Sequence, residues 1–298
     1  PAGDSLTDLI REIQAHTASG SHDQNQLTGG GGGFLDILDA NTPLLVQTIV
    51  LSGNGGTAGV PLGIIGQPQQ AGAVQSALVI DARSQSSGAT IELQHASFAA
   101  IIGAASVTGG AGNQHVWGDG ASQTIILGEG DDVLHGGAGD DIIGSGAGDD
   151  MIYGDEGDDL IFGGEGNDYL DGGAGHDTAR FSSAVDGYSL RVKDGLLVMT
   201  DRMGSDGIDT VAAVEVLRFT GGQSMADDAV LARLYEGVLG RQASAAEVAW
   251  WQDVHARGVS LQQIAATIIG SPEAAQAMGT ADDDAFVAGL YQSVLGRT

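Results

Sequence analysis

Aspartates recur at a fixed interval in the middle of the chain, and glycines surround them. Residues 127 to 180 divide into six consecutive nonapeptides, LGEGDDVLH, GGAGDDIIG, SGAGDDMIY, GDEGDDLIF, GGEGNDYLD and GGAGHDTAR. Each has Gly at position 4, Asp at position 6, and an aliphatic residue or Ala at position 8. Two degenerate units, GGAGNQHVW and GDGASQTII, precede them at 109 to 126. This fixed period indicates a repeat architecture in which every unit makes the same turn and the same strand.

These residue types suit a hard cation, because carboxylates and backbone carbonyls are the ligands that calcium (Ca2+) prefers. Glycine at positions 1, 2 and 4 allows the positive φ and the close backbone approach that a carbonyl-lined turn requires. We therefore predict calcium sites in which position 6 supplies the carboxylate. The predicted aspartate ligands are Asp132, Asp141, Asp150, Asp159, Asp168 and Asp177. The glycines predicted to form the ligating turns are Gly128, Gly130, Gly137, Gly139, Gly146, Gly148, Gly157, Gly164, Gly166, Gly173 and Gly175.

The repeat period also predicts how the sites are assembled. Positions 7 to 9 form a short strand whose middle side chain points into the roll, because side chains alternate along a strand. One unit makes half a turn of the roll, so units 18 residues apart stack on the same edge. Each adjacent pair in a column then holds one ion, which gives about four complete sites. The two predicted columns are Asp132, Asp150 and Asp168 on one edge, and Asp141, Asp159 and Asp177 on the other.

The energetics predict a fold that depends on calcium. Without the ion, stacked carboxylates repel, and short strands around a thin core cannot offset the chain entropy, so we expect the roll to be unfolded. At calcium tenfold above the dissociation constant, each site adds ~1.4 kcal/mol, and four add ~5 to 6 kcal/mol, comparable to the stability of a domain. Gln114 and Gln123 stand at position 6 of the degenerate units. We expect structure there without full calcium sites.

The rest of the chain must support this roll. The predicted fold class is mainly β: a parallel β-roll or β-solenoid with calcium-binding turns, followed by a small α-helical domain. The segment DDAVLARLYEGVLGR at 227 returns as DDAFVAGLYQSVLGR at 283, so we expect a second helical module that continues past residue 298. The predicted divisions are an N-terminal helix with a Gly-rich linker (1–33), an irregular β-solenoid (34–126), the roll (127–180), a β cap (181–223), a helical module (224–280) and the start of a second one (281–298).

Composition limits the partners. The net charge is −28, from 11 Lys and Arg against 39 Asp and Glu. Such a chain repels phosphate backbones and anionic lipids, so we expect no nucleic-acid partner. No apolar run reaches the ~20 residues of a membrane span. The chain has no cysteine, which excludes disulfides, thiolate metal sites and cysteine nucleophiles.

A search for catalytic motifs predicts that the chain is not an enzyme. The seven histidines never form HExxH, and no GxSxG is present. The stretch GNGGTA at 53 to 58 loosely matches a dinucleotide fingerprint, but no alternation of strands and helices follows it. For residues 127 to 180 the alternative is an acidic, disordered linker. Six consecutive matching units argue against it.

The nonapeptides resemble the GGxGxDxUx pattern of the repeat-in-toxin (RTX) family. The resemblance implies export by type I secretion, in which the chain is unfolded inside a bacterium and folds on calcium outside. Residues 224 to 298, with LYEGVLGR and SPEAA, resemble a helical domain of bacterial surface and S-layer-type proteins. Together the two resemblances imply a secreted protein at the bacterial cell surface.

Three functions stay open. The first is a calcium-stabilised surface protein that self-assembles as a homo-oligomer or polymer, such as an S-layer, filament or matrix. The second is a non-catalytic secretion and folding module of a larger RTX toxin or hydrolase. The third is an adhesin that binds cell-surface glycan through Trp250 or Trp251. Outward apolar positions favour the first, because such faces need a cover. They are Val133, Met151, Tyr153 and Tyr169 on one face, and Ile142, Leu160 and Phe162 on the other.

Overall fold

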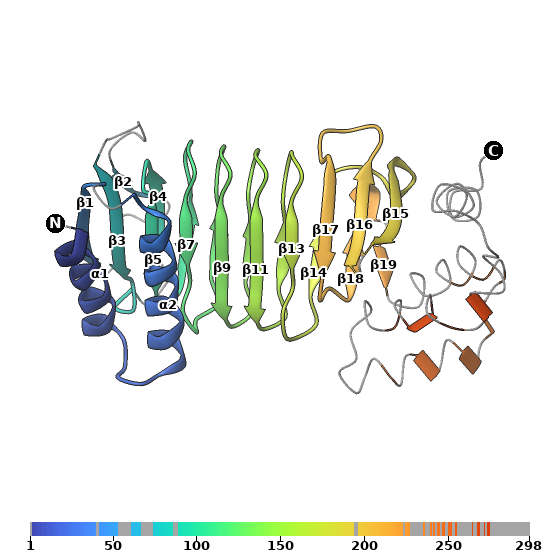
Figure 1. Ribbon diagram of the computed structural model, residues 1–298, viewed down its shortest axis with the longest axis horizontal. Helices are drawn as coiled ribbons and strands as arrows, with labels where there is room; N and C mark the ends of the chain where they lie inside the picture. The colour runs from blue at the N-terminus through green and yellow to red at the C-terminus, as the bar shows by residue number, and fades with distance from the viewer. Residues whose placement is uncertain are drawn as a thin grey trace.

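The described chain is a stack of short strands with two helices packed against one end (Figure 1). The computed structural model describes residues 2–39, 42–52, 61–66, 74–85, 89–193, 196–222 and 224–226, with scattered positions from 235 to 274. The strands form a ten-stranded and a nine-stranded sheet. From β1 to β14, neighbours within each sheet come from alternate strands of the chain, so the backbone passes back and forth between the sheets. The described chain is therefore mainly β, as predicted, and has the arrangement of a β-roll.

The ten-stranded sheet is parallel from β1 to β17 and antiparallel from β17 to β15. In spatial order its strands are β1 (Leu44–Val50), β3 (Gln75–Asp81), β5 (Phe98–Ile102), β7 (His115–Trp117), β9 (Val133–Ala138), β11 (Met151–Glu156), β13 (Tyr169–Asp171), β17 (Ile208–Ala212), β16 (Leu196–Asp201) and β15 (Tyr188–Lys193). Val133 pairs with Met151, and Met151 with Tyr169. The predicted stacking of units 18 residues apart is confirmed.

The nine-stranded sheet is parallel from β2 to β18, and β19 is added antiparallel. Its strands are β2 (Leu62–Ile65), β4 (Ala89–Gln94), β6 (Ala105–Thr108), β8 (Thr124–Ile126), β10 (Ile142–Gly144), β12 (Leu160–Phe162), β14 (Thr178–Arg180), β18 (Val216–Arg218) and β19 (Ser224–Ala226). Two 3-10 segments, Val185–Gly187 and Thr220–Gly222, lie in the connections.

One apolar core runs between the sheets along the whole stack. Position 8 of every repeat contributes to it and is at most 1% exposed, so the predicted inward direction is confirmed. These side chains are Leu134, Ile143, Ile152, Ile161, Leu170 and Ala179. Before the repeats, longer strands such as β3 and β5 bury more residues each, which gives the N-terminal half a thicker core.

Two helices, α1 (Ala2–His16) and α2 (His22–Ile37), cover the ten-stranded sheet near β1 to β7. The prediction of a glycine-rich linker up to residue 33 was wrong, because α2 continues through all five glycines. Gly30 lies directly on the Trp117 ring, where a Cβ would collide, and Gly31 faces Ile13 of α1. Close packing against a sheet and a helix therefore offsets the helix-propensity cost of glycine, ~1 kcal/mol per residue.

The C-terminal end is closed by the hairpin of β15 and β16, and by β19. Rings of Phe181, Tyr188 and Phe219 meet there, with centroids 5.3 to 5.5 Å apart. Strand β19 lies inside the range predicted to be helical, because its backbone pairs with β18. Most of the two predicted helical modules lies outside the described residues. In the part that the structure describes, no helix is long and apolar enough to cross a membrane.

Candidate calcium sites in the repeat turns

Each repeat begins with a turn that lies against the turn 18 residues earlier. The φ angle is 139° at Gly148 and 137° at Gly166, where L side chains are strained. A Cβ at either position would also collide with the carbonyl oxygen of the glycine below it in the column. Most of the predicted glycines share a positive φ: Gly130, Gly137, Gly139, Gly148, Gly157, Gly164, Gly166, Gly173 and Gly175. Gly128 and Gly146 do not, but a Cβ on either would press on a carbonyl oxygen of the neighbouring turn.

The position-6 aspartates form two buried columns, as predicted from their spacing. In the first, the Asp132 amide donates to Asp150 Oδ1 at 2.8 Å, and the Asp150 amide donates to Asp168 Oδ1 at 2.9 Å. In the second column, Asp141 and Asp159 donate in the same way to Asp159 and Asp177, at 2.7 and 2.8 Å. All six side chains are at most 3% exposed. One oxygen of each carboxylate thus fixes the turn that precedes it in the column.

The second oxygen of these carboxylates points into the turn of its own repeat. At Gly136, for example, a Cβ added to the glycine would lie 2.7 Å from Asp141 Oδ2. Within the described residues, five of these oxygens are buried without a hydrogen-bond partner: Oδ2 of Asp141, Asp150, Asp159, Asp168 and Asp177. The sixth, Asp132 Oδ2, accepts a hydrogen bond from Ser145 Oγ at 3.0 Å. Buried polar atoms without partners are costly, so a row of them at equivalent positions fits oxygens that coordinate a cation.

Burial is the main cause that raises the pKa of these carboxyl groups, because it disfavours the ionised form. Burial raises the pKa to about 7 at Asp132, Asp168 and Asp177, to about 8 at Asp141 and to about 6 at Asp159, and also raises the pKa of Asp150. Repulsion from a neighbouring carboxylate of the same column adds to the pKa shift of Asp141 and Asp168. A positive charge inside the turns would therefore favour the ionised form of the columns at neutral pH.

The donor set fits calcium. The described residues contain no group of three or more His, Cys, Asp or Glu side chains that could hold a metal ion. Backbone carbonyls lie beside the aspartates in these turns, and Ca2+ accepts such oxygens readily whereas zinc favours His and Cys. A bound calcium ion would supply the positive charge that the buried carboxylates lack. The protein would supply Asp Oδ2 and the turn carbonyls.

Both columns extend beyond the six repeats to residues that the sequence reasoning missed. The Asp168 amide donates to Asp209 Oδ1 at 3.1 Å, and the Asp177 amide donates to Glu215 Oε2 at 2.7 Å. Asp209 is 3% exposed, and burial raises its pKa to about 8. The signal was present, since GSDGIDTVA at 204 to 212 has Gly, Gly, Asp and Val at positions 1, 4, 6 and 8. The inserted residues 181 to 203 hide its register.

Gln114 and Gln123, at the N-terminal end of the columns, differ in the hydrogen bonds of their side-chain amides. Gln123 Nε2 donates to Asp119 Oδ1 at 2.9 Å and to the Gly103 carbonyl at 3.2 Å, so the amide occupies a position between oxygens. Both side-chain polar atoms of Gln114 are buried without a partner in the described chain. Strands β7 and β8 follow these turns, so the expected structure is present. The expected absence of full calcium sites stays a prediction.

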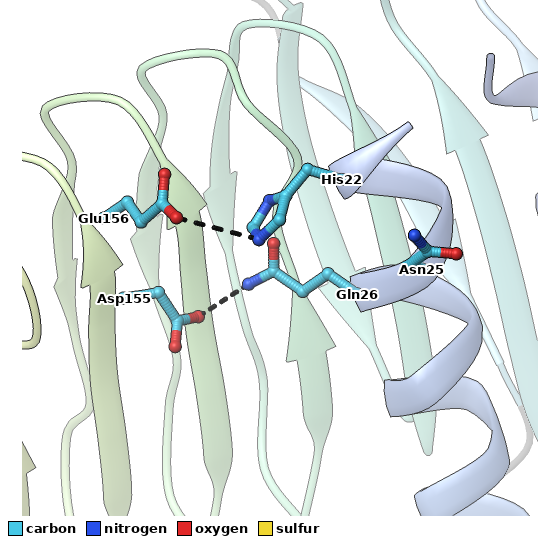
Figure 2. Close-up of a pocket in the computed structure, with 5 residues that line it drawn as sticks. All are labelled: His22, Asn25, Gln26, Asp155 and Glu156. Atoms are coloured by element: carbon cyan, nitrogen blue, oxygen red, sulfur yellow. Dashed lines mark hydrogen bonds and ion pairs between the residues drawn. The ribbon is translucent and has the colours of Figure 1, made fainter. Parts of the chain in front are cut away.

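A polar junction connects helix α2 to the turn of the fourth repeat. Figure 2 shows a shallow pocket lined by His22, Asn25, Gln26, Asp155 and Glu156. Gln26 Nε2 donates to Asp155 Oδ2 at 2.9 Å, and His22 Nε2 lies 3.7 Å from Glu156 Oε1. Asp155 replaces a position-2 glycine and keeps a φ of 73°. This strained residue attaches the N-terminal helices to a turn that belongs to the aspartate columns.

The fold and the turns define a class of protein: a parallel β-roll whose edges carry oxygen-lined candidate cation sites. A comparison with protein families agrees, because the family model for the RTX calcium-binding nonapeptide repeat (4 copies) matches residues 117–152 and 144–179. This region therefore carries RTX repeats, and RTX repeats bind calcium. No curated protein matches the chain. The ligand role of each residue stays a prediction.

Proposed function

We propose that the chain is a secreted structural protein of the bacterial cell surface that folds on calcium and then self-assembles. RTX repeats fit a secreted calcium-binding protein. The observation that carries the proposal is the pair of buried aspartate columns, whose unpartnered oxygens need a cation. Extracellular calcium modules bind at about 10⁻⁴ to 10⁻³ M, so a roll of this type would fold after export and stay unfolded in cytosol.

The number of proposed ions increases with the two extended columns. Three adjacent acidic pairs are now present on each edge, counting Asp168 with Asp209 and Asp177 with Glu215. With one ion per pair, the proposed number is about six instead of about four. The outermost pairs join the repeats to the C-terminal cap. Calcium would therefore stabilise the cap as well as the roll.

Apolar side chains on the outside of the roll support self-assembly. The apolar packing of α1 and α2 on the ten-stranded sheet extends to Trp117 of β7. Helix α2 reaches β11 through polar contacts at Asp155 and Glu156, and Met151 on β11 remains 43% exposed. Ile142 on the other sheet is 42% exposed. The uncovered area is smaller than the sequence predicts, because His135 and Tyr153 stack at 4.4 Å and the Arg180 guanidinium lies 3.9 Å from the Phe162 ring.

The glycan-binding alternative has less support. Trp251 is 7% exposed, and its Nε1 donates to the Tyr235 hydroxyl at 2.8 Å, so it is a core residue. Trp250 is 56% exposed and meets Trp251 edge-on, with centroids 4.3 Å apart. One exposed indole is a weak platform for a sugar ring.

The test is light scattering after size exclusion, with circular dichroism, first in chelator and then in millimolar calcium. We expect β-signal to appear with calcium and large assemblies to follow. β-signal with a persistent monomer would reject self-assembly and favour a non-catalytic module of a larger exported protein. A spectrum that calcium leaves unchanged would reject the calcium-dependent fold itself.

A further inference from the structure

The two ends of the stack are finished differently. At the N-terminal end, β1 is the edge of the ten-stranded sheet and β2 the edge of the nine-stranded sheet (Figure 1). At the other end the edges are β15, whose sequence carries Arg191 and Lys193, and β19, which has only three residues. Charge and shortness are the usual protections of an edge strand against pairing with another chain. Strand β1, with seven residues LLVQTIV, has neither.

The N-terminal end also exposes apolar side chains around its open core. Ile49, Leu51 and Ile64 pack against the core but stay partly exposed. The most exposed apolar side chains of the two strands are Leu45 (43%), Val50 (53%), Leu62 (42%) and Ile65 (71%). Repeat proteins need polar caps at their ends to remain soluble as monomers. The described part of this end lacks one.

The sequence of the two edge strands carries no charge. Residues 40 to 80 contain no Asp, Glu, Lys, Arg or His, in a chain of net charge −28. Two copies of such an acidic chain repel each other across most of their surfaces. Along the two edge strands this repulsion is reduced, because their sequence is uncharged and the carboxylate beside β1, that of Glu12, accepts a hydrogen bond from Thr48 Oγ1 at 2.8 Å.

We propose that two copies of this chain join head to head through this end, with β1 pairing antiparallel to the β1 of the other copy and β2 to its β2. The end offers two strand edges, in separate sheets on opposite sides of one core. A single added peptide strand fills only one edge. A second copy of the same end has both edges at the matching separation, and two-fold symmetry makes such a contact self-complementary. The proposal of this dimer rests on the proposed function, because the dimer would be the first contact of the proposed assembly.

The test changes two exposed edge residues to lysine and measures mass by light scattering in millimolar calcium. The variant is Leu45→Lys with Ile65→Lys; lysine is used because an added carboxylate could bind calcium. We expect the wild type to dimerise and the variant to dimerise at least about 100-fold more weakly. In the variant, each copy loses two aliphatic side chains that the dimer would bury, and the lysines bring like charges together across the interface. Met203→Lys, at a residue that is 84% exposed beyond β16, is the control and keeps the dimer. Circular dichroism must show the same fold for all three.

The possible results separate this interface from the proposed function. Large assemblies that form equally well from the double variant would refute the head-to-head contact and leave self-assembly standing. A dimer that the double variant loses, without larger species in the wild type, would support the contact and count against a surface polymer. A wild type that stays monomeric in calcium at high protein concentration would refute both.

Discussion

Asp150→Asn is the sharpest single test of the aspartate columns. Asp150 stands between Asp132 and Asp168, so two of the proposed sites share its carboxylate. The amide of asparagine keeps an oxygen for the hydrogen bond from the Asp132 backbone, and it removes only the negative charge. Losing two sites at calcium tenfold above the dissociation constant costs about 3 kcal/mol. For a unit of this size that lowers Tm by about 6 to 12 °C.

The same substitution has the opposite expectation in chelator. Burial raises the pKa of the Asp150 carboxyl, so its charge opposes folding when no cation is bound. A neutral amide removes that cost, and we expect Asp150→Asn to be at least as stable as the wild type without calcium. Asp149→Asn is the matched control, because Asp149 is exposed at position 5 and its oxygen contacts only the backbone and side chain of Asn167.

The measurement is thermal unfolding followed by circular dichroism, for the three proteins at a calcium concentration near the dissociation constant and at one far above it. The β-signal in chelator is recorded beside it. The calcium dependence of Tm is the quantity to compare. An Asp150→Asn protein that loses the same Tm at both calcium concentrations, or no more than Asp149→Asn at the higher one, would refute the reasoning. The aspartate would then be a packing residue and not a ligand.

Other measurements test the remaining features. In chelator, lowering the pH should restore β-signal. The folded-state pKa values of Asp168 and Asp177, about 7, lie above the pKa of an aspartate in the unfolded chain. The contribution of these two carboxyl groups to stability is therefore complete below pH ~4 and is lost as the pH rises through 7. Chelator-treated protein that shows no gain of β-signal by pH 5 contradicts this. Asp209→Asn should lower the calcium stoichiometry measured by titration calorimetry by about one ion; an unchanged stoichiometry removes Asp209 from the column. Gly32→Ala should raise Tm, since its Cβ meets nothing within 4 Å and alanine favours the helix by ~1 kcal/mol, whereas Gly30→Ala should lower it through collision with Trp117. Equal effects of the two would show that α2 does not pack as described.

The repeat region was predictable because its information is local and periodic. Position 8 gave the core residues, such as Ile152, and position 6 gave both columns, because the stacking distance follows from the unit length alone. No knowledge of other segments was needed. The family match covers this same region.

The wrong linker prediction and the missed column residues both lie where tertiary contacts decide the local structure. The five glycines of α2 indicate a linker by composition, but Gly30 allows the helix to lie on Trp117, which is distant in sequence. Asp209 and Glu215 join the columns only after a hairpin insertion, so the period does not reach them. Asp155, with its φ of 73°, departs from the glycine pattern to receive a hydrogen bond from Gln26.

The hydrogen bonds within the columns give the roll a direction. Each turn donates its position-6 amide to a carboxylate that lies later in the chain, as Asp132 does to Asp150. A turn therefore becomes complete only after the following coil has been laid down. Cutting the chain inside the repeats would leave the last amide of each column without its acceptor, whereas Asp209 and Glu215 provide that acceptor at the natural end of the columns. The exposed position-5 amides bond in the opposite direction, as the Asn167 amide does to Asp149 Oδ1. The buried position-6 sites are thus the part of each turn that depends on the coil that follows it.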